Sequence, residues 1–451
     1  MGRFVKKIYI GYNLIRMDIF NKKFYLFIFA AILVLPACRR PKPYKKSVFT
    51  EEKREQIYKK RVITFTSGGG GGHMSAAHAV RSILQDQYEV VDVYLLRDVL
   101  APLDFVRQFS FEYSSAEDLY NYFITNRYIW FTNTLCSYGK YNMPRKDKRM
   151  QQLISDFLDI NKPDLMISVI PVVNYSLLAV AEKKGIPLII VPTDLDNSMF
   201  VIGMEKSNLH YPLYRYISPF DHLGILKIIE SGGIPKQNLV VGGFPIREEF
   251  FVKKNIKKLK NDFGIPLNKP VITVLMGAAG SSSTYDYVKK LSHSKHALHV
   301  IVCLGRNEAL RKKIEKIRLP YNVTLSIIGF TDQMPDIMAM SDLLITKCGT
   351  VSVMEAVHAQ VPVLLDCTAR AVMWEAFNVK FITENGFGLA VNNLSELDYL
   401  IDKVLVDRDF YGQCKLNLKK FEKPRFSTIL KDLVAKLLQD AKNYTVDITV
   451  Q

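Results

Sequence analysis

The sequence predicts an α/β protein with two domains, each built on a parallel sheet whose strands alternate with helices. From Arg61 onward, short apolar runs alternate with amphipathic stretches, which is the rhythm of strand–helix–strand units. The chain has 451 residues, whereas a single hydrophobic core stops growing near ~250–300 residues. The rhythm also restarts after a loop near 266–270. We therefore expect one domain over 61–247, a second over 248–405, and C-terminal helices over 406–451 that pack back on the first.

Each expected strand is a short apolar run that ends at a turn. In the first domain the expected strands are 62–66, 88–94, 164–170, 188–193, 215–218 and 239–241. In the second domain they are 271–276, 298–304, 324–328, 342–346 and 361–366. A helix is expected over 74–85, and the amphipathic stretch 426–442 is expected to return to the first domain.

Residues 1–60 form a basic extension with 15 of the 61 Lys and Arg and only 4 of the 44 Asp and Glu. Its uncharged run Phe24–Ala37 is short for a spanning helix and has basic flanks. We expect association with an anionic membrane surface on the cytoplasmic face, and no nucleic-acid partner. Export is the alternative, because Leu35–Cys38 resembles a lipoprotein cleavage site. The six cysteines lie far apart and indicate neither a disulfide framework nor a zinc site.

An aromatic block covers Asp104–Tyr141, where 12 of the residues are Phe, Tyr or Trp. One interpretation is a helical core patch. The other is a subdomain that binds the acceptor or faces a membrane, because Tyr and Trp favour the headgroup region of a bilayer. On the second interpretation Trp130 is an acceptor-side residue.

A glycine-rich loop, Ser67–His73, follows the first expected strand and opens a helix. It lacks the lysine of a phosphate-binding P-loop, although a dinucleotide fold, with Asp92 at the ribose, stays open. His73 lies where ligands bind in open α/β sheets, and an imidazole can take a proton from an attacking hydroxyl. The alternative is a loop histidine that only bonds to the backbone.

Two further strand–helix junctions indicate a nucleotide site. Met276–Ser283 combines small residues and hydroxyls, which suits a diphosphate at a helix N-terminus. Lys347–Ala356 follows an expected strand, and Thr350 is expected to cap the helix that begins there. On that helix the carboxylate of Glu355 can accept two ribose hydroxyls, or it can serve as an ion-pair partner.

These motifs together resemble one family, over roughly residues 62–400. The sequence is similar to the diacylglycerol glycosyltransferases, that is, the monogalactosyldiacylglycerol synthases and processive diacylglycerol glucosyltransferases, which are related to the lipid-II-forming N-acetylglucosaminyltransferase. Seven segments match in order: the loop ending at His73, Thr193–Leu195, Gly243–Arg247, Met276–Gly277, Gly305–Asn307, Gly329–Met334 and Thr346–Ala356. Glu375 and Asn378 match a further pattern in which Trp374 replaces a glutamine.

The resemblance implies a GT-B fold, with two Rossmann-like domains facing across a cleft and Gly243–Arg247 as the linker. It implies transfer of a hexose from a UDP-sugar to a lipid, expected to be diacylglycerol, with inversion and without a metal or cofactor. His73 and Asp194 are the implied catalytic residues, with Gly71 and Gly72 on the acceptor side. The implied donor-binding residues are Gly277, Ser281, Arg306, Phe330, Lys347, Gly349, Thr350, Glu355, Glu375 and Asn378.

Two alternatives remain at this point. A nucleotide-sugar 2-epimerase uses the same architecture but acts without a lipid, and a non-catalytic protein could bind a nucleotide sugar or a lipid. The sequence departs from the plastid members of the family after Thr193–Leu195, and Trp374 stands in place of glutamine. These departures leave the sugar and the exact acceptor open, and the number of subunits is not indicated.

Overall fold

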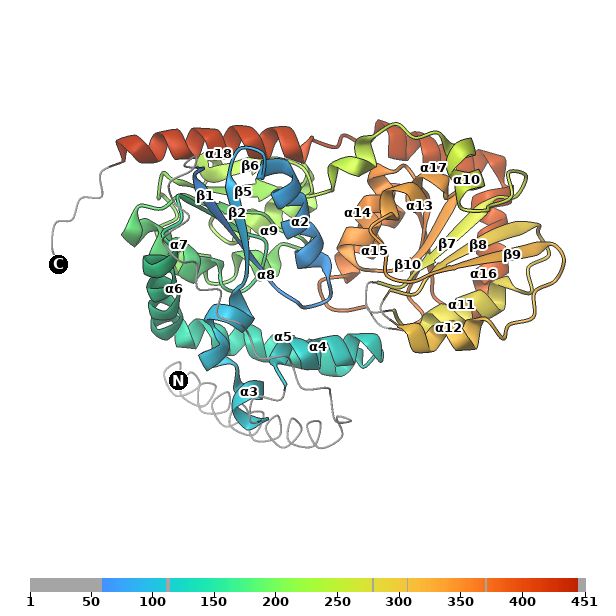
Figure 1. Ribbon diagram of the computed structural model, residues 1–451, viewed down its shortest axis with the longest axis horizontal. Coiled ribbons are helices and arrows are strands. Elements are labelled where there is room, and N and C mark those ends of the chain that lie inside the picture. Colours follow the sequence, from blue (N-terminus) through green and yellow to red (C-terminus); the bar gives the residue numbers. More distant parts are fainter. Residues whose placement is uncertain (1–58, 111–113, 278–279, 306, 370, 445–451) are drawn as a thin grey trace, which may run out of the picture.

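The structure is a computed structural model that describes residues 59–110, 114–277, 280–305, 307–369 and 371–444. The predicted basic extension lies outside the described residues, apart from its last two positions. The described chain forms two lobes side by side along the long axis, each built on a parallel sheet (Figure 1). The predicted α/β class and its two-sheet division are confirmed.

The first lobe contains a six-stranded sheet of order β2-β1-β3-β4-β5-β6. Its strands are β1 (Arg61–Thr66), β2 (Glu89–Tyr94), β3 (Leu165–Ser168), β4 (Leu188–Ile190), β5 (Tyr214–Ser218) and β6 (Leu239–Val241). Its helices are α2 (Gly72–Leu84), α3 (Phe105–Phe109), α4 (Ala116–Thr125), α5 (Ile129–Asn142), α6 (Asp147–Asn161), α7 (Asn174–Lys184), α8 (Ser198–Val201) and α9 (Leu223–Ser231).

The second lobe contains a six-stranded sheet of order β12-β11-β10-β7-β8-β9. Its strands are β7 (Val271–Leu275), β8 (Leu298–Cys303), β9 (Val323–Ile328), β10 (Leu343–Lys347), β11 (Val363–Asp366) and β12 (Gly388–Val391). Its helices are α10 (Ile256–Asp262), α11 (Ser283–Leu291), α12 (Glu308–Ile314), α13 (Met334–Met340), α14 (Thr350–His358), α15 (Ala376–Glu384), α16 (Leu397–Ile401) and α17 (Arg408–Lys420).

Short helical turns complete both lobes. Two are π-helical, Leu95–Val99 and Asp402–Val406. The others are single 3₁₀ turns at Ala101–Leu103, Met143–Lys146, Met204–Lys206, Lys236–Asn238, Glu248–Phe251 and Leu394–Glu396. The central strands are apolar runs because helices cover both faces of each sheet; every residue of β3, β7 and β8 is buried.

The last helix, α18 (Phe426–Asn443), returns to the first lobe as predicted (Figure 1). Its apolar stripe, which includes Leu430 and Val434, packs in one cluster with Ala76 and Val80 of α2. The predicted boundary at 406 is too early, however, because α17 stays with the second lobe. There the Lys415 ammonium and the Asn417 amide donate to the backbone carbonyls of Gln360 and Gly386.

The chain crosses between the lobes twice, and the two crossings touch at Gly243. This residue has φ +87°, and a Cβ atom there would lie 2.2 Å from the Pro424 carbonyl oxygen. We expect Gly243→Ala to lower the free energy of unfolding by at least about 2 kcal/mol, as left-handed strain adds to overpacking. Gly264→Ala is the control, because Gly264 has φ +66° with open space around it. Equal shifts of the urea midpoint for both variants would contradict this prediction.

Among the described residues, no helix has both the length and the apolar character that crossing a bilayer requires.

Candidate active site

A cavity of about 560 Å³ lies between the lobes, within the range typical of small-molecule sites. Loops that follow parallel strands supply its walls: the glycine-rich loop after β1, the Thr193–Asp194 loop after β4, Gly277 after β7, and Lys347–Thr350 after β10. Because the carboxyl ends of parallel strands share one edge of a sheet, each lobe presents its ligand-binding edge to the other.

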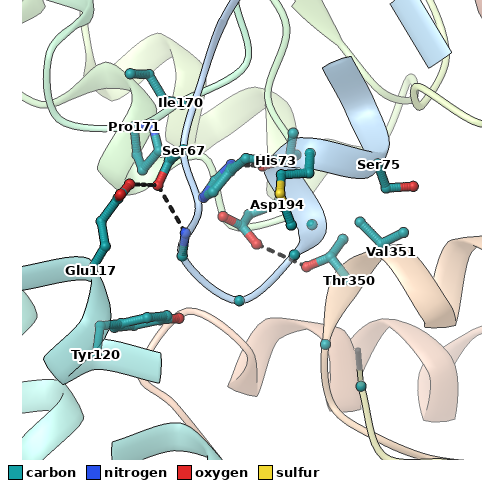
Figure 2. Close-up of a pocket in the computed structure, with 18 of the residues that line it drawn as sticks. Ser67, His73, Ser75, Glu117, Tyr120, Ile170, Pro171, Asp194, Thr350 and Val351 are labelled. Carbon is teal, nitrogen blue, oxygen red and sulfur yellow. Dashed lines mark hydrogen bonds between the residues drawn. The ribbon is translucent and has the colours of Figure 1, made fainter. Parts of the chain in front are cut away.

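The glycine-rich loop is held from one side by α4. The Gly68 amide donates to Glu117 Oε1 at 3.0 Å, and the Gly70 amide donates to Asn121 Oδ1 at 2.8 Å. The Ser67 hydroxyl also donates to Glu117, and Tyr120 lies against the loop (Figure 2). These two amides therefore have protein partners. The predicted acceptor-side residues Gly71 and Gly72 line the cavity, together with Gly69, Gly70 and the first turn of α2.

His73 lies in the first turn of α2 and lines the cavity (Figure 2). Its Nδ1 is 2.9 Å from the Val169 carbonyl oxygen and 2.9 Å from the Thr193 hydroxyl oxygen. A carbonyl only accepts, so Nδ1 carries the proton and Nε2 keeps a lone pair. Burial lowers the pKa of His73 to about 4, although the bond to Val169 acts in the opposite direction. The imidazole is therefore neutral at pH 7 and can accept a proton.

Asp194 connects the two lobes. Its Oδ1 accepts a hydrogen bond of 3.0 Å from the Thr350 hydroxyl, which belongs to the second lobe (Figure 2). Burial raises the pKa of Asp194 to about 7, the bond from Thr350 lowers it, and the nearby carboxylates of Glu375 and Asp196 raise it. Asp194 thus changes its ionisation near neutral pH.

The predicted cap at Thr350 is wrong. Thr350 is the first residue of α14, and Gly349 occupies the cap position. The Thr350 hydroxyl instead donates a hydrogen bond to Asp194, and it accepts a hydrogen bond of 2.9 Å from the Asn378 amide. The first backbone N–H groups of α14 have no partner within the helix, which leaves them available to an anion in the cavity.

Glu355 lies on α14 and lines the same cavity as His73. Its side chain is buried, with the Arg247 guanidinium 3.9 Å from Oε1. Burial raises the pKa of Glu355 to about 7, and the charge of Arg247 opposes that rise. Arg247 also donates to the Asp332 carbonyl, so it holds the segment between the lobes against the second lobe. Glu355 is therefore an ion-pair partner of Arg247 that also lines the cavity, and its contact with a ribose stays a prediction.

A second charged pair lies near Asp194. The Lys347 ammonium is 3.1 Å from Glu375 Oε1, and both residues line the cavity with Gly277 and Gly349. Side chains at either glycine would meet the Lys347 stem at 3.0 Å. Ser281 lines a smaller adjoining cavity of about 70 Å³ that shares Gly277, Lys347 and Glu375 with the main one. The wall of the second lobe is therefore polar and carries charges of both signs.

Two further predicted site residues do not line the cavity. Asn378 is fully buried and does not line the cavity; its amide donates to the Cys348 carbonyl and the Thr350 hydroxyl, so it positions α14 rather than facing a ligand. Trp130 is 68% exposed at the start of α5 and also lies outside the cavity lining. Arg306 lies outside the described residues. Phe330 lines the cavity and is 55% exposed.

The aromatic block forms α3, α4 and α5 with a small core of their own around Val106, Leu119 and Phe123. It also reaches the second lobe. Arg127, at the α4–α5 turn, donates to the Thr368 hydroxyl at 2.7 Å, and Asn133 of α5 accepts from the Met373 amide at 3.1 Å. The block therefore spans the two lobes beside the cavity.

Sequence reasoning missed several residues of this site. Glu117 and Asn121 hold the glycine-rich loop but carry no signal beyond their place in the aromatic block. Arg247 and Thr193 lay inside recognised motifs, and only the fold shows that they contact Glu355 and His73. Asp92, the alternative ribose ligand, is bonded to Arg81 and does not line the cavity.

Comparison with known proteins finds glycosyltransferases and other proteins of the same fold. The lipid-A-disaccharide synthetase family matches residues 221–424. The structure of Acinetobacter baumannii MurG superposes with a TM-score of 0.56 at 16% identity, covering 84% of this chain and 100% of MurG. A UDP co-structure of S. aureus MnaA superposes with a TM-score of 0.52 at 14% identity, covering 86% and 98%. The fold is therefore GT-B, as the motifs implied.

Sequence comparison identifies the relatives within that fold. The chain is 25% identical over 394 residues to the processive diacylglycerol beta-glucosyltransferase of Bacillus pumilus, covering 85% of this chain and 98% of that protein. It is 23% identical over 383 residues to the protein of the same name from Bacillus subtilis, covering 84% and 95%. The resemblance to diacylglycerol glycosyltransferases is confirmed over nearly the whole length of these relatives.

Proposed function

We propose that this protein transfers a hexose from a UDP-sugar to a hydroxyl of diacylglycerol, with inversion at the anomeric carbon. One observation carries the proposal: the neutral imidazole of His73 and the buried carboxylate of Glu355 line one cavity from opposite lobes of the protein. The names of the Bacillus relatives support the lipid acceptor and the transferred sugar class.

On the donor side, Glu355 accepts the two ribose hydroxyls. The backbone N–H groups at Gly349 and Thr350 bind the diphosphate, and the positive end of the α14 dipole favours the charge that develops as UDP leaves. Lys347 lies on the same wall and adds a positive charge. Glu375 accepts hydroxyls of the sugar. These groups supply the charge stabilisation for which other transferases use a metal ion.

On the acceptor side, Nε2 of His73 takes the proton of the acceptor hydroxyl. The hydroxyl oxygen forms a bond to the anomeric carbon, and the bond from that carbon to the diphosphate oxygen breaks, with UDP taking the electron pair. Because the oxygen attacks from the face opposite the leaving group, the configuration inverts. Asp194, beside His73, positions the acceptor.

Contacts across the cleft favour transfer over hydrolysis. Asp194 meets Thr350, and Arg127 meets Thr368, so side chains of the two lobes are in contact beside the cavity. A closed site excludes water, which would otherwise compete with the lipid hydroxyl for the sugar.

We also propose that the protein acts at the cytoplasmic face of a membrane. The α4–α5 region exposes Tyr128, Trp130 and Tyr141, and basic side chains such as Lys140 and Arg145 lie close by in the chain. Exposed aromatics beside basic groups suit the headgroup region of an anionic bilayer, and the basic extension adds to that attraction.

The direct test incubates the purified full chain with UDP-glucose, UDP-galactose or UDP-N-acetylglucosamine and diacylglycerol vesicles, with and without EDTA. We expect a glycolipid by mass spectrometry from one of the hexose donors, an inverted anomeric signal by NMR, and the same rate in EDTA. A change of the sugar nucleotide without lipid would instead support the 2-epimerase alternative. Donor binding with no product would support a binding protein.

The pH dependence of transfer should report the bond between Thr350 and Asp194. That bond favours the ionised carboxylate, so its loss in Thr350→Val raises the pKa of Asp194 above about 7. If ionised Asp194 positions the acceptor, the acid limb of the kcat/KM profile moves up by about one pH unit. Ser352→Ala, on the same helix, is the control and should leave the limb in place. An unmoved limb in Thr350→Val would exclude this role for Asp194.

A further inference from the structure

The cavity has an apolar section in the first lobe, away from the donor wall. We define it by six residues that line the cavity from the π-helix Leu95–Val99 and the residue after it, from α3, from α5 and from the turn after α5: Leu96, Leu100, Phe105, Leu135, Tyr138 and Met143. It belongs to the same cavity as His73 and the glycine-rich loop. A ligand with its reacting hydroxyl at His73 can therefore extend into this section without leaving the cavity.

The polar side chains beside the apolar section already have protein partners. The Asp104 carboxylate accepts from the amides of Val106, Arg107 and Ala116. The Lys146 ammonium donates to the Leu103 carbonyl at 3.0 Å, and the Asn142 amide donates to the Tyr138 carbonyl at 3.0 Å. A sugar or a peptide would bury polar groups here against a hydrocarbon wall, at a cost in free energy. A hydrocarbon chain would not.

Gly139 keeps space open within this wall. It lies inside α5, which runs from Ile129 to Asn142, and it lines the cavity. A Cβ atom built at Gly139 would meet nothing within 4 Å. A glycine inside a helix is less stable than an alanine there. The missing side chain leaves a gap on the cavity side of α5.

We propose that the apolar section holds one acyl chain of the acceptor, and that Gly139 is the residue that leaves room for it. This inference rests on the proposed function, because it takes the acceptor to be a lipid whose hydroxyl reacts at His73. It assigns the chain-binding site to α3, α5 and the π-helix, and it makes the length of the acyl chain a determinant of acceptor specificity.

Gly139→Phe tests the proposal, because the new ring can enter the open space. We expect kcat/KM for long-chain diacylglycerol to fall by about tenfold or more, since the chain loses hydrophobic burial. For a diacylglycerol with very short chains, the fall should be much smaller. Gly139→Leu should give an intermediate loss. Gly412→Phe is the matched control: Gly412 lies in α17, is exposed, and has the same open surroundings.

A direct binding measurement separates this inference from the proposed function. A fluorescent long-chain fatty acid should bind to the wild type and to Gly412→Phe, and much more weakly to Gly139→Phe and Gly139→Leu, with circular dichroism confirming that all are folded. The proposed acyl-chain site would be overturned if the Gly139 variants bound the probe as well as the wild type does. It would also be overturned if they lost activity equally on short-chain and long-chain diacylglycerol. If only the Gly139 variants lose probe binding, while the wild type forms no glycolipid, the proposed function is refuted but the acyl-chain site is not.

Discussion

His73→Gln is expected to lower the rate of lipid glycosylation by about 10²–10⁴-fold at pH 7, the usual contribution of a general base. Glutamine fills similar space and can still hydrogen-bond to the Val169 carbonyl, but it cannot hold the transferred proton. Because burial lowers the pKa of His73 to about 4, the wild-type imidazole is neutral throughout the range from pH 6 to 8. The loss should therefore be the same across that range.

The measurement is kcat for glycolipid formation, together with UDP binding by calorimetry, which should not change because His73 lies on the acceptor-side lobe. His78→Ala is the control. It removes an exposed histidine that lines the same cavity from the next turn of α2. A His73→Gln protein that transfers sugar at the wild-type rate would refute the base assignment.

Glu355→Gln is expected to raise the KM for the UDP-sugar by about 10–100-fold. We propose that the carboxylate accepts two ribose hydroxyls, and hydrogen bonds to a charged group contribute about 1.5–3 kcal/mol. The value of kcat should change less, because the ribose is bound alike in the ground and transition states. Glu384→Gln, an exposed carboxylate paired with Lys380, is the control.

The pH dependence of donor binding gives a second readout for Glu355. Burial raises its pKa to about 7, so the free enzyme holds the protonated form below that pH. The wild-type KM for donor should therefore rise as pH falls from 8 to 6, while Glu355→Gln shows no such rise. An unchanged KM in the variant, or identical pH profiles, would place the ribose elsewhere.

Most strands were predictable because a parallel strand covered on both faces is an apolar run that ends at a turn. Among the described residues, the strand that the sequence analysis missed is β12, which has four residues and begins at Gly388. Its pairing with β11 depends on that glycine, since a Cβ atom there would lie 1.9 Å from the Val363 carbonyl oxygen. A close backbone approach of this kind has no signature in hydrophobic patterning.

The two walls of the site were predictable because loops after parallel strands gather at one edge of each sheet. Contacts between the lobes were not. Whether Thr350 caps its own helix or donates to Asp194 depends on how the lobes meet, and local propensity favoured the cap. Asn378 matched a motif position, yet its burial beneath α14 depends on the packing of α15, which spacing along the chain does not determine.

The α4–α5 pair has three neighbours at once. It holds the glycine-rich loop through Glu117 and Asn121, walls the apolar section through Gly139, and meets the second lobe through Arg127 and Asn133. Any shift of this pair that accompanies entry of a lipid would therefore reach Thr368 and Met373, on the lobe where we propose that the nucleotide binds. Coupling between two binding sites is reciprocal. If bound lipid changes the affinity for the sugar nucleotide by some factor, bound sugar nucleotide changes the affinity for the lipid by the same factor. A helix pair that contacts both sites would therefore couple the binding of the two proposed substrates, although the substrates do not touch each other there.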